Sequence, residues 1–278
     1  MPHQIGFVDN SGGVLAHYKM LEAIRDFASA NGWTVLRYNT ASANRELILK
    51  GAGYTGEEEI FVGFRTYQDA SADYYNLVAA AFTGYVPSNT FDTQPGAMLS
   101  GVPAHNNRID YWLTLNPQRI ALAMKVGTPV YESCYVGKFL PYARPSQYPY
   151  PVIAAGMLSG TPATRFSETA HSIPYKGARA NMRMRFNDGV WKQPECYPWN
   201  NANIHGVTRQ LRDTGSQYPL QRVVLSDSGG LYGELDGIYA ITGFNNAVEN
   251  TDAAADLVVI QDVGRTGFID YYAMRLDD

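Results

Sequence analysis

The chain has 278 residues, of which 45% are hydrophobic and 17% are charged, and its formal net charge is -4. Because disorder requires low hydrophobicity and high net charge, this composition excludes a disordered chain and indicates a folded one. The pI of about 5.7 argues against direct nucleic-acid binding, which usually shows a basic face.

The first predicted element is a helix. Asn10 and Ser11 are candidates for its N-cap, and apolar residues recur at three- and four-residue spacing from Val14 to Ala28. Glycine accepts the left-handed conformation of a helix C-terminus, so Asn31-Gly32 should end the helix. The residues that follow predict a strand at 33–36.

The next segments predict two strands and a second helix. Residues 45–50 and 58–67 are rich in β-branched and aromatic side chains around a Gly-rich connection, which is typical of strands. Over 71–83, Ser71 is a candidate N-cap for a helix. The buried stripe of this helix would consist of Tyr75, Val78, Ala79 and Phe82.

Beyond a loop at 86–108 the pattern predicts mainly strands. Residues 111–115 and 120–126 form a predicted hairpin, because Pro117 in the turn Asn116-Pro117-Gln118-Arg119 presets a type I turn. A third strand is expected at 130–139. Shorter strands are expected at 181–186, 221–225, 238–244, 257–263 and 269–276.

The predicted fold class is α+β, with N-terminal helices on an antiparallel sheet followed by a mainly β C-terminal half. We expect an α+β domain at 1–139, a Tyr/Pro-rich linker or arm at 140–162 and a mainly β domain at 163–278. Five prolines exclude a regular helix from the middle segment. Its tyrosines favour an arm that packs on a neighbouring subunit, with the predicted contact residues Tyr142, Arg144, Tyr148 and Tyr150.

Motifs of catalytic or cofactor sites are weak in this sequence. Gly51-Ala52-Gly53-Tyr54-Thr55-Gly56 matches GxGxxG, but three glutamates and a strand follow it where a dinucleotide site needs a helix, so we interpret it as a hairpin loop. Ser226-Asp227-Ser228-Gly229-Gly230 lacks the GxSxG pattern and is interpreted as a turn. We therefore expect no enzymatic activity and no cofactor.

Metal, disulfide and membrane sites are likewise not indicated. The five histidines are scattered singly, and Cys134 and Cys196 belong to no Cys/His cluster, which favours reduced thiols over a zinc site or a disulfide. The first residues have no basic and apolar signal-peptide pattern. The longest apolar stretch, near 152–158, is too short to span a bilayer.

A small cationic patch is predicted in the second half. Alternation over 181–186 puts Arg183 and Arg185 on one strand face and two methionines on the other. The arginines either bind a carboxylate-bearing neighbour or form a solvated outer face, and the sequence leaves both readings open.

Several stretches resemble a group of tailed-bacteriophage virion proteins, and together they span nearly the whole chain. They are Asn-Gly-Trp-Thr-Val-Leu at 31–36, Glu-Glu-Ile-Phe-Val-Gly-Phe-Arg-Thr-Tyr at 58–67, Ala-Asp-Tyr-Tyr-Asn at 72–76, Phe-Thr-Gly-Tyr at 82–85, Tyr-Pro-Tyr-Pro at 148–151, Gly-Glu-Leu-Asp-Gly-Ile-Tyr at 233–239, Thr-Gly-Phe at 242–244 and Gln-Asp-Val-Gly-Arg-Thr-Gly at 261–267. The resemblance implies a non-enzymatic structural component of the tail, neck or baseplate, such as a tail terminator or connector. It also implies a homo-oligomeric ring, other virion proteins as partners, and location in the virion after assembly in the host bacterial cytoplasm.

Two alternative functions remain. A glycan-binding module of the tail would use exposed aromatic side chains, for which Trp191, Tyr197 and Trp199 are the candidates. A glycan hydrolase would use the carboxylates of Glu234 and Asp236, which lie two residues apart and can share a strand face.

Overall fold

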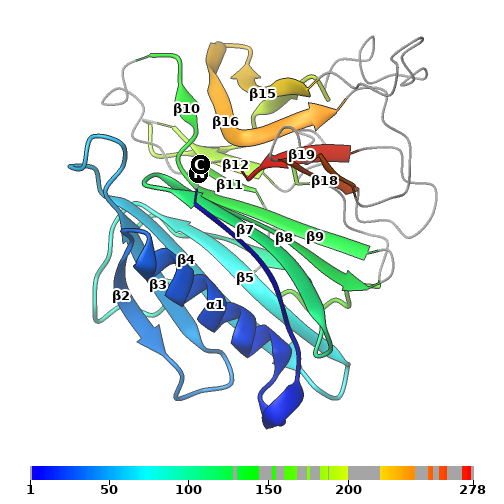
Figure 1. Cartoon of the computed structure of the whole chain (residues 1–278). Coiled ribbons are helices and arrows are strands. Elements are labelled where there is room, and N and C mark those ends of the chain that lie inside the picture. Colours follow the sequence, from blue (N-terminus) through cyan, green and yellow to red (C-terminus); the bar gives the residue numbers. More distant parts are fainter. Residues whose placement is uncertain are drawn as a thin grey trace.

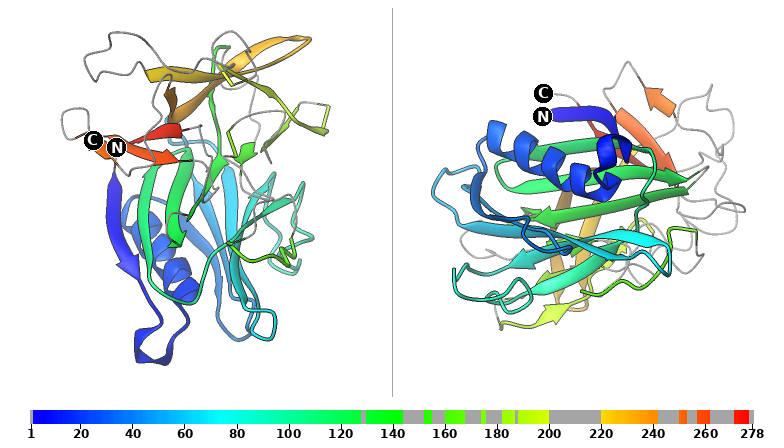
Figure 2. Two further views of the ribbon diagram at one scale, coloured as in Figure 1. Left: turned by 90° about the vertical axis from the view of Figure 1, so that its right-hand side faces the viewer. Right: turned by 90° about the horizontal axis from the view of Figure 1, so that it is seen from below.

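The computed structural model describes residues 2–127, 130–143, 152–154, 160–167, 174–175, 182–186, 188–199, 220–241, 250–252, 257–261 and 271–276. Its three antiparallel sheets are stacked in layers, with β7, β8 and β9 in the middle (Figure 1). Figure 2 shows the same stack from two further sides. The α+β prediction is wrong, because 54% of the structure is strand and only one helix in its described part is seven residues or longer.

The central sheet, sheet A, has seven strands in the order β1-β7-β8-β9-β11-β12-β13. Strands from both predicted domains of the chain share it, and the division into domains at 1–139 and 163–278 stays a prediction. The strands are β1 (His3–Val8), β7 (Ile109–Asn116), β8 (Arg119–Gly127), β9 (Val130–Gly137), β11 (Val152–Ala154), β12 (Met182–Arg185) and β13 (Trp191–Lys192).

Sheet B lies on one side of sheet A and is formed by five consecutive strands. They are β2 (Thr34–Asn39), β3 (Glu46–Gly51), β4 (Ile60–Asp69), β5 (Tyr74–Phe82) and β6 (Met98–Val102). Sheet C lies on the other side, in the order β14-β15-β16-β19-β18-β17, with β10 paired to β16. Its strands are β10 (Leu140–Pro141), β14 (Glu195–Tyr197), β15 (Leu220–Asp227), β16 (Gly230–Ile241), β17 (Asn250–Asp252), β18 (Leu257–Gln261) and β19 (Tyr271–Arg275).

The single long helix, α1 (Ala16–Ala30), packs its apolar face into the core between sheets A and B. It ends as predicted at Asn31-Gly32, where Gly32 has a φ of 88°. The predicted N-cap is wrong. A short 3-10 turn, η1 (Ser11–Gly13), occupies that position, and the backbone N–H of Ala16 instead donates to the side-chain oxygen of Asn106 over 3.0 Å.

The second predicted helix is strand β5. Its side chains alternate between two buried faces: Leu77, Ala79 and Ala81 face the core shared with sheet A, and Val78, Ala80 and Phe82 face a smaller core on the outside of sheet B. A strand covered on both faces reads as a continuous apolar run, so periodicity does not separate it from a buried helix.

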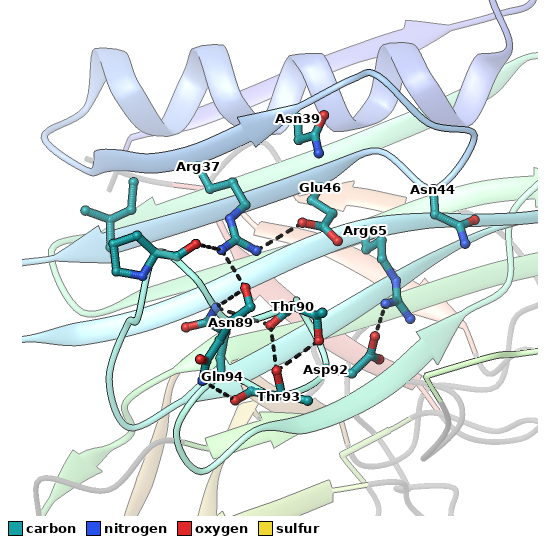
Figure 3. A network of polar contacts seen from close by, with 12 residues as sticks. Arg37, Asn39, Asn44, Glu46, Arg65, Asn89, Thr90, Asp92, Thr93 and Gln94 are labelled. Carbon is teal, nitrogen blue, oxygen red and sulfur yellow. Dashed lines mark hydrogen bonds and ion pairs between the residues drawn. The ribbon is translucent and has the colours of Figure 1, made fainter.

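The segment between β5 and β6 covers the outer face of sheet B. Phe91 from this segment is fully buried there. The guanidinium of Arg37 donates to the carbonyl oxygens of Pro87 and Asn89 over 2.9 and 2.7 Å, and Arg65 forms an ion pair with Asp92 (Figure 3). These contacts from β2 and β4 hold the segment against the sheet.

The two cysteines lie in cores on opposite sides of sheet A, and neither forms a disulfide. Cys134 belongs to the core shared with sheet B, and Cys196 to the core shared with sheet C. Burial raises the pKa of the Cys134 thiol to about 12.

Candidate functional site

Six polar residues from four places in the chain meet where the Gly-rich loop touches sheets A and C. We call this cluster the polar junction: Tyr54, Glu58, Asn116, Arg119, Lys138 and Asp236. The loop between β3 and β4 reaches the β7–β8 turn, and the backbone N–H of Gly53 donates to the carbonyl of Pro117 over 2.9 Å. The GxGxxG stretch is thus a hairpin loop, as predicted.

Asp236 on β16 is the centre of the polar junction. It is buried, and its Oδ2 atom accepts hydrogen bonds from the Tyr54 hydroxyl over 2.9 Å and from the Asn116 amide. The other end of the Asn116 side chain accepts from the backbone N–H groups of Gln118 and Arg119 over 3.0 and 3.1 Å. Asn116 therefore shapes the β7–β8 turn and joins it to sheet C.

A buried ion pair between Glu58 and Lys138 lies in the same cluster. The Lys138 side chain is 4% exposed, and its ammonium contacts the Glu58 carboxylate. The backbone of Lys138 also donates to the Gln118 carbonyl over 2.8 Å. A buried charge without a partner is costly in free energy. The Gly-rich loop therefore has to hold Glu58 beside the buried ammonium of Lys138.

The electrostatics of the polar junction keep Tyr54 and the neighbouring Tyr135 protonated. Partial burial, followed by the negative charge of Asp236, raises the pKa of Tyr54 well above its ordinary value. Full burial, followed by the same charge, raises the pKa of Tyr135 on β9, although the positive charge of Arg119 opposes this. Tyr54 thus acts as a hydrogen-bond donor to a carboxylate, an arrangement that joins sheets.

The two carboxylates of the hydrolase hypothesis have separate partners. Asp236 bonds to Tyr54 and Asn116, whereas Glu234 accepts from Arg222 on β15 over 2.7 Å. Both are buried. Asp236 therefore belongs to the polar junction between the sheets, whereas Glu234 belongs to an ion pair with Arg222 within sheet C.

The aromatic residues of the glycan-binding hypothesis are largely used in packing. Trp191 packs against the core between sheets A and B, and its indole N–H donates to the Gly96 carbonyl over 3.1 Å. Trp199 packs against the core on the other side of sheet A. Tyr197 is exposed. The three side chains therefore lack a common stacking surface.

The predicted contact residues are only partly within the described chain. The Tyr142 side chain is exposed. The residue lies beside β16, because its backbone N–H donates to the Tyr232 carbonyl over 3.0 Å. The other three residues of the Tyr/Pro segment, Arg144, Tyr148 and Tyr150, lie outside the described residues. The structure therefore describes Tyr142 as an accessible position and leaves its role as a contact residue a prediction.

The predicted alternation at Arg183 and Arg185 is confirmed. Both arginines are half-buried on one face of β12, opposite the buried Met182 and Met184. Arg183 donates to the side-chain oxygen of Gln193 over 3.2 Å, and Arg185 lies 6.0 Å from the ring centre of Trp191. The patch is thus partly covered by its own chain.

Sequence reasoning missed β1, an exposed strand at the end of sheet A. Ile5 and Phe7 project from it and are 53% and 52% exposed, and the Arg108 guanidinium lies 3.9 Å above the Phe7 ring. The β-branched and aromatic residues Ile5, Phe7 and Val8 are the signal that indicates a strand here.

Neither a metal-ion cluster nor a membrane-spanning helix is found in the described residues. Within the described residues, no group of three or more His, Cys, Asp or Glu side chains is placed to hold a metal ion. Of the helices in that same part of the chain, none has the length and apolar character needed to cross a membrane. In comparisons with known proteins, no family model and no curated protein matches this chain.

Proposed function

We propose that the chain is a structural subunit of a tailed-bacteriophage virion, located in the tail, neck or baseplate and acting through contacts with neighbouring subunits. The resemblance described above supports this assignment over nearly the whole sequence. A homo-oligomeric ring, with other virion proteins as further partners, belongs to the same proposal.

The exposed edge of β1 is the observation that carries the proposal. Monomeric proteins usually protect an edge strand with charges, prolines, bulges or a cover, because its free backbone groups recruit other strands. β1 instead exposes Ile5 and Phe7 beside its free edge. An exposed, unpaired strand edge of this kind suits a protein that assembles with other subunits.

The alternatives receive less support from the geometry. The carboxylates of Glu234 and Asp236 are bound to separate partners, and two of the three candidate glycan-stacking aromatics are partly buried against the cores. Both alternative functions therefore depend on side chains that already form hydrogen bonds, ion pairs or packing contacts within the fold.

The test is the composition of the phage particle. Virions of the phage that encodes this chain would be purified by density gradient and analysed by quantitative mass spectrometry, with antibody labelling in electron micrographs. We expect a fixed copy number per particle and label on the tail, neck or baseplate. Absence of the chain from intact particles would refute the proposal.

A further inference from the structure

Strand β1 has one paired edge and one free edge. It pairs with β7 in an unbroken antiparallel register that sets Gly6 opposite Tyr111. No strand in the described part of the chain pairs with its other edge. Figure 2 shows β1, in dark blue, at the margin of the molecule.

The backbone groups at the free edge can be assigned to particular residues. The backbone N–H of Leu115 donates to the carbonyl of Pro2, so the residues in phase with Pro2 direct their polar groups toward β7. Hydrogen-bonding direction alternates along an antiparallel strand. His3, Ile5 and Phe7 therefore direct their backbone N–H and C=O groups away from the sheet, at the free edge.

Other sheet ends in this protein are protected in ways that β1 is not. β2 carries Arg37 and has a register shift between Val35 and Arg37. β13, β14 and β17 are only two or three residues long. β6 has Pro162 packed against its Gly101. β1 has six residues, no charged side chain and no shift in register, so it is the edge best suited to accept another strand.

We propose that the free edge of β1 pairs antiparallel with β1 of a second copy of this chain, around a two-fold axis at Gly6. This pairing rests on the proposed function, since it names a further copy as one partner of the subunit. It sets Ile5 opposite Phe7 twice, so four exposed apolar side chains pack in two cross-strand pairs.

A donor–acceptor pair at each end of the pairing supports this register. With the axis at Gly6, His3 of one copy lies opposite Asp9 of the other, so an imidazole donor meets a carboxylate at each end of the pairing. Hydrogen bonds from Ser11, with Lys19 3.2 Å away, lower the pKa of Asp9 to about 2, which keeps it ionised. The opposed pairs Ile5–Phe7 and His3–Asp9 also match the free-edge groups assigned above.

The two-fold contact differs from the contacts of a ring. It is isologous and closes after two copies, joining two seven-stranded sheets into one. A ring needs heterologous contacts, which other surfaces would make. If a subunit makes both kinds of contact, each subunit of one ring would pair through β1 with a subunit of a second ring.

The experiment is the solution mass of the purified full chain, measured by sedimentation equilibrium over a range of concentrations. We expect a monomer–dimer equilibrium for the unmodified chain. Phe7→Lys puts a charge into the apolar pairs and should raise the dimer dissociation constant at least about 100-fold. Leu231→Lys is the matched control, because it places the same charge on another exposed apolar residue, and it should leave the constant unchanged. Circular dichroism checks that both variants fold.

Cross-linking tests the register. A mixture of Ile5→Cys and Phe7→Cys chains should form a disulfide-linked heterodimer on mild oxidation, whereas neither variant alone should. A disulfide between two Ile5→Cys chains would overturn the axis at Gly6.

The pairing itself and the proposed function can fail separately. A chain that stays monomeric at all concentrations, or a dimer that survives Phe7→Lys, would overturn the pairing. The particle analysis above tests the function independently. A monomeric chain that enters virions only with Phe7 intact would assign the β1 edge to a strand from another virion protein.

Discussion

The Tyr54 hydroxyl donates a hydrogen bond of 2.9 Å to the Oδ2 atom of Asp236, a residue 182 positions further along the chain. This bond joins the Gly-rich loop of sheet B to sheet C across the end of sheet A. Asp236 is buried, so each donor to its carboxylate contributes to the stability of the junction.

Tyr54→Phe tests that bond. Since it removes a hydrogen-bond donor to a buried carboxylate, we expect a loss of about 1–2 kcal/mol in the free energy of unfolding, measured by urea titration. Tyr142→Phe is the control, because that exposed phenol has no recorded hydrogen bond within the described residues, and its effect should stay within about 0.5 kcal/mol. Equal effects of the two changes would contradict a role for the Tyr54–Asp236 bond.

Gly53→Ala tests how the Gly-rich loop protects the Glu58–Lys138 pair. Gly53 has a φ of 65°, and an added Cβ would collide with Glu58. We expect a loss of at least about 3 kcal/mol in the free energy of unfolding, because the collision leaves a buried lysine unpaired.

Gly12→Ala is the matched control for this change. Gly12 has a similar φ of 70°, but nothing lies within 4 Å of an added Cβ. Its cost should be limited to backbone strain of about 1–2 kcal/mol. If Gly53→Ala costs no more than Gly12→Ala, the ion pair tolerates the displacement of Glu58 and the interpretation fails.

His17 makes stability depend on pH. It is buried on α1, with its ring centre 4.5 Å from that of Tyr18 and 5.6 Å from that of Tyr75. Burial, with a smaller effect of the Arg45 charge and an opposing effect of Gln68, lowers its pKa from 6.5 to about 3. Between these two values the unfolded chain binds a proton that the folded chain does not. The stabilisation is therefore fully present above pH 6.5 and declines as the pH falls toward 3.

The measurement is the free energy of unfolding of the unmodified chain and of His17→Met between pH 8 and pH 4. The contribution of His17 should fall by up to about 1.4 kcal/mol per pH unit below 6.5. His17→Met lacks this dependence, so the difference between the two curves isolates it from the titration of carboxylates. Parallel curves would show that His17 titrates alike in both states.

Arg37→Lys should loosen the segment that covers sheet B. A lysine cannot reproduce the planar fork with which Arg37 contacts the carbonyls of Pro87 and Asn89. We expect hydrogen exchange in residues 86–94 to become about tenfold faster, which corresponds to about 1.4 kcal/mol of local stability. Arg25→Lys, whose ion pair is with the adjacent Asp26, is the control and should leave this exchange unchanged. Faster exchange in both variants would point to a general loss of stability.

Local patterns predicted much of the secondary structure correctly. Turn residues and β-branched runs placed β3, β4 and the β7–β8 hairpin within about two residues of their observed bounds. The Asn31-Gly32 stop placed the end of α1. These signals lie in neighbouring residues, so they can be interpreted from the sequence without knowledge of tertiary contacts.

The errors share a physical cause, which is burial by distant parts of the chain. β5 has both faces covered, so its apolar run matched a helical stripe as well as a strand. The side chain that accepts from the first backbone N–H of α1 belongs to Asn106, 90 positions away from Ala16, and no local pattern predicts it. The polar junction is equally non-local. The sequence presents Asp236 as part of a carboxylate pair, whereas its partners Tyr54 and Asn116 lie 182 and 120 positions earlier in the chain.

The central position of sheet A has a consequence for synthesis on the ribosome. Trp112, Tyr135 and Phe139 belong to the core between sheets A and C, and their cover includes Tyr272 and Met274 of the last described strand. While the chain emerges from its N-terminus, this aromatic face is complete long before the strands that bury it exist. The growing chain therefore carries a solvent-exposed apolar surface until β19 has been synthesised, and a chain that stops before β19 would leave that surface exposed.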